Sequence, residues 1–173
     1  VTVSPTANTT YYVRAEGPTP CATTTACASL LVTVNTLSTA PTSISGTTTI
    51  CNGVSTTLSV VGGSLGTGAN WQWYRNGCAG VPLGSGNSIT VSPSTTTDYY
   101  VRAEGTCNNT ACAAVTVTVQ DTSLPATSIA GPSYICTGNS TSLSVVGGFL
   151  GTLANWQWYS GSCGGTPVGS GTS

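Results

Sequence analysis

The sequence predicts an all-β protein built from two-sheet sandwich modules in tandem, with a repeat of about 85–88 residues. Short stretches of alternating apolar and polar residues are separated by Gly, Pro, Ser and Asn at intervals of about ten residues, a spacing typical of β-sandwiches. No segment carries apolar residues at helical spacing over a useful length. The same strand-like blocks occur twice, which indicates a repeat protein.

The repeat has two spacings, separated by a loop of variable length. Two blocks recur 88 positions later, namely Val3–Pro5 at Val91–Pro93 and Tyr11–Gly17 at Tyr99–Gly105. Two others recur 85 positions later, namely Leu58–Gly63 at Leu143–Gly148 and Asn70–Tyr74 at Asn155–Tyr159. The difference falls between Gly17 and Cys27, where the first copy has the longer loop.

The phase of the repeat divides the chain into unequal parts. Val1 aligns with Ile89 and Ser173 with Ser88, so the last residue would lead into the first residue of another copy. We therefore expect the second half of a module at 1–35, a complete module at 36–120 and the first half of a module at 121–173. Neither half can bury its apolar face alone. We expect a neighbouring segment of a longer precursor, or a separate subunit, to complete each half.

Six strands are expected in the complete module: Thr42–Ile50 (broken), Ser55–Gly62, Asn70–Arg75, Ser88–Val91, Asp98–Glu104 and Ala111–Val119. Side chains alternate between the two faces of a strand, and this alternation predicts which apolar residues point inward. They are Leu58, Val60, Trp71, Trp73, Ile89, Val91, Tyr99, Val101, Ala103, Val115, Val117 and Val119. Six to seven strands in about 85 residues is the size of an immunoglobulin domain.

Several motifs resemble an immunoglobulin-like module: Ile50–Gly53, Trp73-Tyr74, Gly84–Gly86, Thr96–Val101 and Val115–Val119. Together they are similar to the Ig-like repeats of very large secreted surface proteins of gliding, Bacteroidetes-type bacteria. The resemblance implies a long extracellular adhesin or filament that is exported and anchored by other regions. Val101 occupies the core position at which antibody domains carry a Cys, so no inter-sheet disulfide of that kind is expected.

The composition argues against most enzymes and against nucleic-acid binding. Charged residues make up 4% of the chain, with three Arg, no Lys and no His. The carboxylates are Glu16, Asp98, Glu104 and Asp121, so most acid–base catalysis lacks its residues and we expect no enzyme. A net charge of −1 without a basic cluster cannot neutralise a phosphate backbone. No apolar run reaches the roughly 18 residues of a membrane span.

No metal or cofactor is expected either. Calcium needs six to eight oxygen ligands, usually with several carboxylates close together, and Asp98 and Asp121 are each isolated in the sequence. The threonines at Thr116–Thr118 and Thr23–Thr25 are reminiscent of ice-binding solenoids. Those solenoids need short repeats that stack in register, and a period of about 85 residues is too long.

The eight cysteines predict disulfides rather than a zinc site, because no CxxC spacing occurs. Cys51 precedes the second strand and Cys78 follows the third, which should place both at one end of the sandwich. Cys107 and Cys112 flank the last hairpin. The expected pairs are Cys51–Cys78, Cys136–Cys163, Cys107–Cys112 and Cys21–Cys27. Disulfides indicate an oxidising, extracellular setting, and redox chemistry is the alternative interpretation.

The outward faces of the third, penultimate and last strands form a candidate interaction face: Gln72, Tyr74, Tyr100, Arg102, Thr116 and Thr118. Such a mixture of aromatic rings and hydroxyls can bind glycans or a partner surface. We favour lateral contacts between modules, because each copy in a fibre needs neighbours. Arg102 with Glu104, and Arg14 with Glu16, should form surface ion pairs worth less than about 1 kcal/mol.

The sequence thus predicts a secreted structural or adhesive protein of an extracellular filament or long cell-surface adhesin. Its expected partners are copies of itself, end to end and laterally, with surface glycans as a further candidate. The alternative is a carbohydrate-binding array of a secreted polysaccharide-degrading protein, which glycan binding would distinguish. Asn-X-Ser/Thr sequences at Asn8, Asn108 and Asn139 are candidate glycosylation sites that would help to keep a chain with so few charges soluble.

Overall fold

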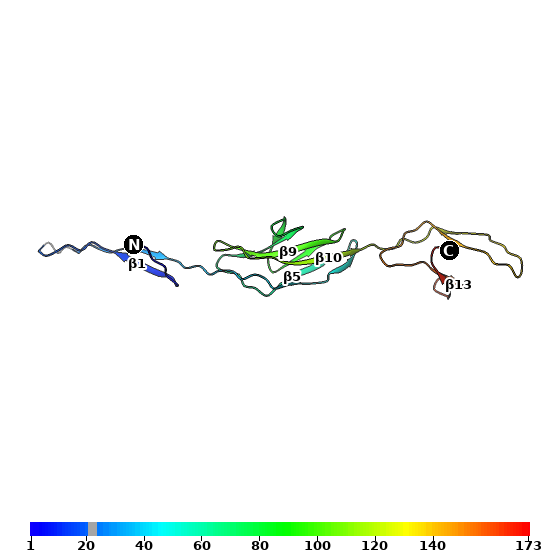
Figure 1. The fold of residues 1–173 in the computed structure, drawn as a ribbon, viewed down its shortest axis with the longest axis horizontal. Helices are drawn as coiled ribbons and strands as arrows, with labels where there is room; N and C mark the ends of the chain where they lie inside the picture. The colour runs from blue at the N-terminus through cyan, green and yellow to red at the C-terminus, as the bar shows by residue number, and fades with distance from the viewer. Residues whose placement is uncertain (21–23) are drawn as a thin grey trace.

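The computed structural model describes residues 1–20 and 24–173. The molecule is elongated, with a two-stranded hairpin at the N-terminal end, a sandwich in the middle and two further ribbons at the C-terminal end (Figure 1). Every regular element in the described residues is a strand. The all-β prediction is therefore confirmed.

The central sandwich consists of two sheets. One has the order β3-β5-β8, and the other has the order β4-β10-β9-β6-β7. The strands are β3 (Ser43–Ser45), β4 (Thr49–Cys51), β5 (Thr56–Val61), β6 (Asn70–Arg75), β7 (Val81–Ser85), β8 (Ser88–Val91), β9 (Thr97–Glu104) and β10 (Ala113–Gln120). The predicted strands at Asn70–Arg75 and Ser88–Val91 coincide with β6 and β8.

The expected broken first strand divides between the two sheets. β3 pairs antiparallel with β5, and after a short crossover β4 pairs parallel with β10. Gly46 lies in this crossover at φ +142°, and a Cβ there would stand 2.5 Å from the Thr57 carbonyl oxygen. The close approach of the two backbones thus requires glycine at this position.

β7 was not among the expected strands. Pro82 and Gly84 interrupt its sequence, so Val81–Ser85 has the composition of a turn. It is an edge strand, and its one ladder partner within residues 1–20 and 24–173 is β6, with a register shift between Trp73 and Tyr74. Proline is tolerated at such an edge because its missing N–H leaves no ladder partner unsatisfied.

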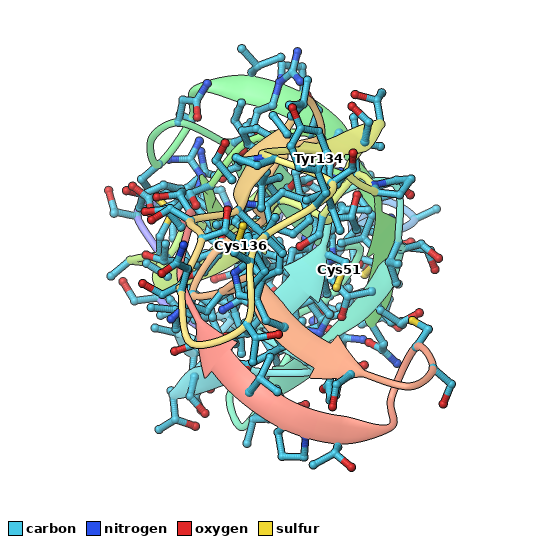
Figure 2. The ribbon with its side chains drawn as sticks, turned by 90° about the vertical axis from the view of Figure 1, so that its right-hand side faces the viewer. Cys51, Tyr134 and Cys136 are labelled. Carbon is cyan, nitrogen blue, oxygen red and sulfur yellow. A yellow bond between two sulfur atoms is a disulfide. The ribbon has the colours of Figure 1, made fainter. Side chains whose placement is uncertain are left out.

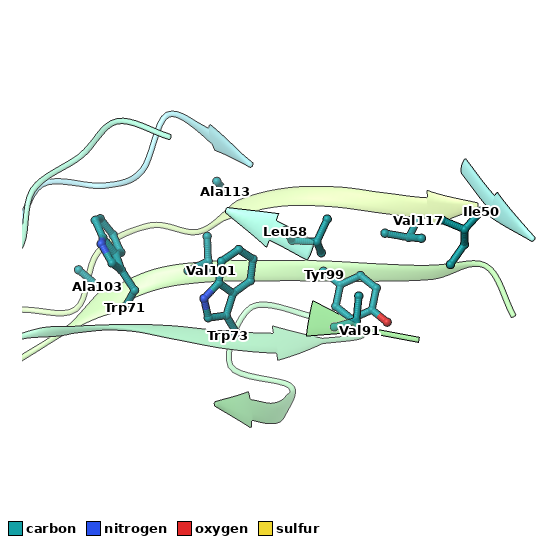
Figure 3. Packing of buried hydrophobic residues seen from close by; sticks show 10 residues of the cluster. All are labelled: Ile50, Leu58, Trp71, Trp73, Val91, Tyr99, Val101, Ala103, Ala113 and Val117. Atoms are coloured by element: carbon teal, nitrogen blue, oxygen red, sulfur yellow. The ribbon is translucent and has the colours of Figure 1, made fainter. Parts of the chain in front are cut away.

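The core of the sandwich lies between its two sheets (Figure 3). Trp73, Leu58, Val101 and Val117 are its largest fully buried side chains. Trp73 also donates its indole N–H to the Gly86 carbonyl oxygen at 2.8 Å, so its polar atom is satisfied inside the core. The remaining buried apolar residues are Ile50, Trp71, Val91, Tyr99, Ala103 and Ala113.

The two terminal parts form ribbons rather than sandwiches. The N-terminal part is the hairpin of β1 (Thr9–Val13) and β2 (Ala28–Val32). The C-terminal part contains two antiparallel pairs, β11 (Ser128–Ala130) with β12 (Ser144–Val146) and β13 (Gln157–Ser160) with β14 (Thr166–Ser170). In these parts many apolar side chains remain exposed, including Val13, Leu30, Ile135 and Leu143.

Candidate interaction face

The six residues of the candidate interaction face lie together on the large sheet of the sandwich, in the adjacent strands β6, β9 and β10. In the β6–β9 ladder, Gln72 is opposite Arg102 and Tyr74 is opposite Tyr100. These four side chains are half-buried. The two remaining residues, Thr116 and Thr118 on β10, are exposed.

A polar cluster occupies the β6–β9 part of this face. The Tyr74 hydroxyl donates to Glu104 Oε1 at 2.5 Å, and Arg102 Nε donates to the same oxygen at 2.7 Å. A second guanidinium nitrogen of Arg102 completes the ion pair with Glu104. The Arg102 guanidinium also lies 5.5 Å from the centre of the Tyr74 ring, in the range of a cation–π contact. Arg102 and Glu104 therefore pair as expected, with Tyr74 as a third member.

Two acidic residues also lie on this face: Glu104, which was expected to pair with Arg102, and Asp98, which was not among the expected residues. Glu104 closes the Tyr74–Arg102 cluster, and Asp98 accepts a hydrogen bond from the Thr116 hydroxyl at 2.6 Å. Strand alternation would have found Asp98 as well, because it has the same parity along β9 as Tyr100, Arg102 and Glu104. Since Tyr74 and Arg102 are bonded to Glu104, and Thr116 is bonded to Asp98, a ligand that binds these three side chains would have to compete with these contacts.

The cluster shifts the pKa values of its members in opposite directions. The hydrogen bond from Tyr74 is the main reason why the pKa of Glu104 is lowered, and Arg102 lowers it further. The same bond to Glu104, followed by burial, raises the pKa of Tyr74. The cluster is thus fully formed only at a pH between these two pKa values.

Tyr74→Phe is expected to lower the free energy of unfolding of the module by about 1 kcal/mol at neutral pH. A carboxyl whose folded pKa is lowered contributes stability above its ordinary pKa, and this contribution is lost as the pH falls through the folded value. A tyrosine with a raised pKa contributes below pH 10, and its contribution is lost as the pH rises through the folded pKa. Urea unfolding at several pH values should therefore show the variant and the wild type converging in acid and in strong alkali.

The matched control for this prediction is Tyr159→Phe, because Tyr159 occupies the position of Tyr74 in the C-terminal part. It is exposed, and its substitution should leave the unfolding of the central sandwich unchanged at every pH. A Tyr74→Phe difference of constant size from pH 3 to pH 8 would contradict the role assigned to Glu104.

The structure corrects three of the expected disulfides. Cys78 is bonded to Cys112, with their Cα atoms 6.0 Å apart, so the pairs Cys51–Cys78 and Cys107–Cys112 are wrong. Cys51 ends β4, which crosses to the large sheet and lies beside β10, opposite Gln120. Two strands, β10 and β9, therefore separate it from β6 and the turn that holds Cys78.

The position of Cys112 explains why Cys107 is not its partner. Ala113, the next residue, is buried in the core, so strand alternation directs the Cys112 side chain to the outer face of the sheet. There it meets the β6–β7 turn, whereas Cys107 is exposed in the β9–β10 turn. Cys136 and Cys163 are not bonded to each other. The expected pair Cys21–Cys27 involves Cys21, which lies outside the described residues.

Removal of the observed disulfide by the double substitution Cys78→Ser and Cys112→Ser should destabilise the sandwich by about 3–4 kcal/mol, the loop-entropy value for a closure of this size. The measurement is denaturant unfolding without reductant. The double substitution Cys51→Ser and Cys107→Ser is the matched control, and it should change the stability by less than about 0.5 kcal/mol. An equally large loss in both variants would support the pairing expected from sequence, because each double substitution removes one member of both of those pairs.

The candidate glycosylation sites differ in their surroundings. Asn8 and Asn139 are exposed, although Asn8 Oδ1 accepts a hydrogen bond from the Val34 amide. Asn108 is half-buried, and its side chain both accepts from the Ser38 amide and donates to the Ser38 carbonyl oxygen. Attachment of a sugar to the Asn108 amide nitrogen would disturb this contact.

Other kinds of site were also sought in the described residues. Residues 1–20 and 24–173 contain no group of three or more His, Cys, Asp or Glu side chains that could hold a metal ion. Within the same residues, no helix has the length and apolarity needed to cross a membrane.

Comparison with protein families identifies the central part of the chain. Residues 39–120 match the family model described as "Ig-like domain CHU_C associated". No curated protein matches the chain at a significant level. The matched range contains both sheets of the sandwich, so the family match and the strand topology agree on an Ig-like fold.

Proposed function

We propose that this chain, whose residues 39–120 form an Ig-like domain of a type associated with Bacteroidetes surface proteins, is a structural or adhesive segment of an extracellular filament or long surface adhesin. Its Ig-like modules stand in tandem, and each half-module is completed by a neighbouring copy. The chain acts through these contacts and has no catalytic role.

One observation carries this proposal. Residues of the same type at equivalent repeat positions are buried in the middle of the chain and exposed at its ends. Val101 is 0% exposed, whereas its equivalent Val13 is 69% exposed. Leu58 is 0% exposed, whereas its equivalent Leu143 is 40% exposed. The ends of the chain thus expose apolar residues that are buried at the equivalent positions of the sandwich. A partner that covers these residues best explains why they are apolar.

The Cys78–Cys112 disulfide supports an extracellular location, because such bonds persist in oxidising compartments. The low charge content supports a structural role, since 4% charged residues leave few groups for acid–base chemistry or for binding polyanions. The self-satisfied polar cluster around Tyr74 is consistent with a face that stacks laterally on other modules.

The test is the association state of the full 173-residue chain, produced in an oxidising compartment. Sedimentation and negative-stain electron microscopy should reveal linear, unbranched assemblies whose length grows with protein concentration. A glycan array with the same preparation tests the carbohydrate-binding alternative. Strong, selective glycan binding by a chain that stays monomeric at all concentrations would overturn the proposal.

A second measurement addresses the arrangement in the native material. After full reduction and denaturation, a chain mass near 17 kDa would indicate separate subunits. A mass many times larger would indicate consecutive repeats of one polypeptide. Both arrangements agree with tandem modules, and they differ in whether assembly requires polymerisation.

A further inference from the structure

We propose that residues 1–35 of one copy of this chain complete residues 121–173 of a second copy in one fixed register, and that Cys27 of the first copy and Cys163 of the second then form a disulfide. This inference rests on the proposed function, because it specifies the junction by which the tandem modules are joined.

The first line of evidence is where the C-terminal strands stop. β5 in the sandwich covers six residues, but its equivalent β12 covers only Ser144–Val146. The missing part is 141–143, and its equivalents Thr56–Leu58 are the residues that pair with Ile89–Val91 of β8. The repeat equivalents of Ile89–Val91 are Val1–Val3, at the other end of the chain.

Two other segments of the C-terminal part also lack residues that pair, in the sandwich, with strands of the opposite half. β13 lacks the equivalents of Asn70 and Trp71, the two β6 residues that pair with β9 alone. No strand forms at 134–136, the equivalent of β4, whose partner in the sandwich is β10. Seen from the C-terminal end, Tyr134 and Cys136 lie on a looped segment (Figure 2).

The two strands of the N-terminal hairpin are also shorter than their equivalents in the sandwich, at the complementary positions. β9 extends to Glu104, but its equivalent β1 ends at Val13, three residues short of the matching position. The missing positions correspond to Arg102–Glu104, whose ladder partners lie in β6. β2 likewise lacks the equivalents of Thr118–Gln120, which pair with β4. Strands β1, β2, β12 and β13 are therefore short at positions whose partners belong to the opposite half of a module, whereas β11 and β14, whose partners lie in the same half, keep the full length.

The sandwich gives the register of the junction directly. Trp73 pairs with Val101 in the module, so Trp158 of one copy should pair with Val13 of the next. The three expected ladders join 141–143 to 1–3, 155–160 to 11–16, and 134–136 to 33–35.

Both surfaces that would meet carry exposed apolar groups. A groove on the N-terminal part is lined mainly by apolar side chains, among them Val3, Tyr11 and Val13. A groove on the C-terminal part is lined by 141–143 together with Trp158 and Val168. The register inserts Val1–Val3 of the second copy beside 141–143, which covers the C-terminal groove with a β-strand, as in strand-addition complexes.

A polar contact is also divided between the two halves. Arg14 and Glu16 form an ion pair in the N-terminal part, equivalent to Arg102 and Glu104. The third member of the sandwich cluster is Tyr74, whose equivalent Tyr159 lies in the C-terminal part. In the proposed register Tyr159 of one copy donates to Glu16 of the next.

The disulfide follows from the same equivalence. Cys78 and Cys112 are bonded in the sandwich, and their equivalents are Cys163 and Cys27. These two cysteines lie in parts at opposite ends of the molecule, separated by the whole sandwich (Figure 1). The bond therefore joins two copies. It forms by thiol–disulfide exchange, in which a disulfide oxidant takes up two electrons and two protons and is released as two thiols.

The experiment uses equal amounts of unlabelled and ¹⁵N-labelled full-length chain, mixed under reducing conditions and then oxidised with a glutathione disulfide buffer. The mixture is digested without reduction and analysed by mass spectrometry. The expected result is a Cys27–Cys163 peptide of which about half carries one labelled and one unlabelled partner. The Cys78–Cys112 peptide is the internal control, and it should contain no such mixed species. Cys163→Ser should abolish the mixed peptide while linear association persists.

The possible outcomes separate this inference from the proposed function. Linear assemblies with Cys27 bonded to Cys21, or with no mixed Cys27–Cys163 peptide, would overturn the inference and leave the filament proposal intact. A Cys27–Cys163 peptide without mixed labelling would overturn closure by a second copy. A chain that remains monomeric and unlinked would overturn both.

Discussion

Replacement of Val13 by Asp is expected to abolish end-to-end association of the chain while leaving the unfolding of the central sandwich unchanged. Val13 is 69% exposed in the single chain, so a carboxylate there costs little before assembly. In the proposed junction the carboxylate would be buried beside Trp158 without a cationic partner, which costs several kcal/mol. Since every 1.4 kcal/mol is a factor of ten in affinity, association should weaken by at least a hundredfold.

The matched variant for this prediction is Val101→Asp, which places the same charge at the equivalent position of the sandwich. Val101 is fully buried between Trp73 and the β10 strand, so this variant should fail to fold its central module. Sedimentation velocity measures the association of Val13→Asp, and tryptophan emission follows the module. If the Val13→Asp variant associated as strongly as the wild type, residue 13 would not be buried at the junction.

Trp73→Ala should lower the free energy of unfolding of the sandwich by about 3–5 kcal/mol. Trp73 is fully buried at the centre of the core, and its indole N–H is the donor that satisfies the Gly86 carbonyl. The substitution leaves both a cavity and an unpaired carbonyl oxygen. Because small domains are stable by only about 5–15 kcal/mol, this loss should remove a large share of the stability of the module.

Trp158→Ala tests the same substitution in the C-terminal part, where the sandwich is incomplete because the equivalents of β8, β9 and β10 are not present. Trp158 also donates to the carbonyl of an equivalent glycine, Gly171, but its ring is only half-buried. In a monomeric preparation this variant should leave the unfolding transition of the sandwich within about 0.5 kcal/mol of wild type. Guanidinium unfolding followed by circular dichroism measures both variants, and equal losses would contradict the independence of the sandwich from the terminal parts.

The strand pattern of the sandwich could be predicted because it depends on local alternation. The alternation predicts that Leu58, Trp73 and Val101 point into the core. Each of these three side chains is buried in the module, as expected. β7 could not be predicted, because Pro82 and Gly84 give it the composition of a turn and its pairing depends on β6. The split of the first strand into β3 and β4 likewise depends on contact with two different sheets.

The candidate interaction face was also predicted in part from the sequence and in part only from the tertiary structure. The sequence placed Tyr74, Tyr100 and Arg102 on one side of the sheet, since parity along a strand needs no tertiary information. It could not show that Tyr74 and Arg102 converge on one oxygen of Glu104, because that requires the register between β6 and β9. The register is a non-local property that the turn and the packing determine together.

The sequence by itself determined the all-β class, the period of the repeat and the inward-facing residues of each strand, because these follow from the chemistry of neighbouring residues. Tertiary structure alone decided the pairing of Cys78 with Cys112 and the crossing of β4 to the large sheet. A disulfide requires two Cα atoms within about 7 Å, and proximity between distant residues depends on how the strands are ordered in space.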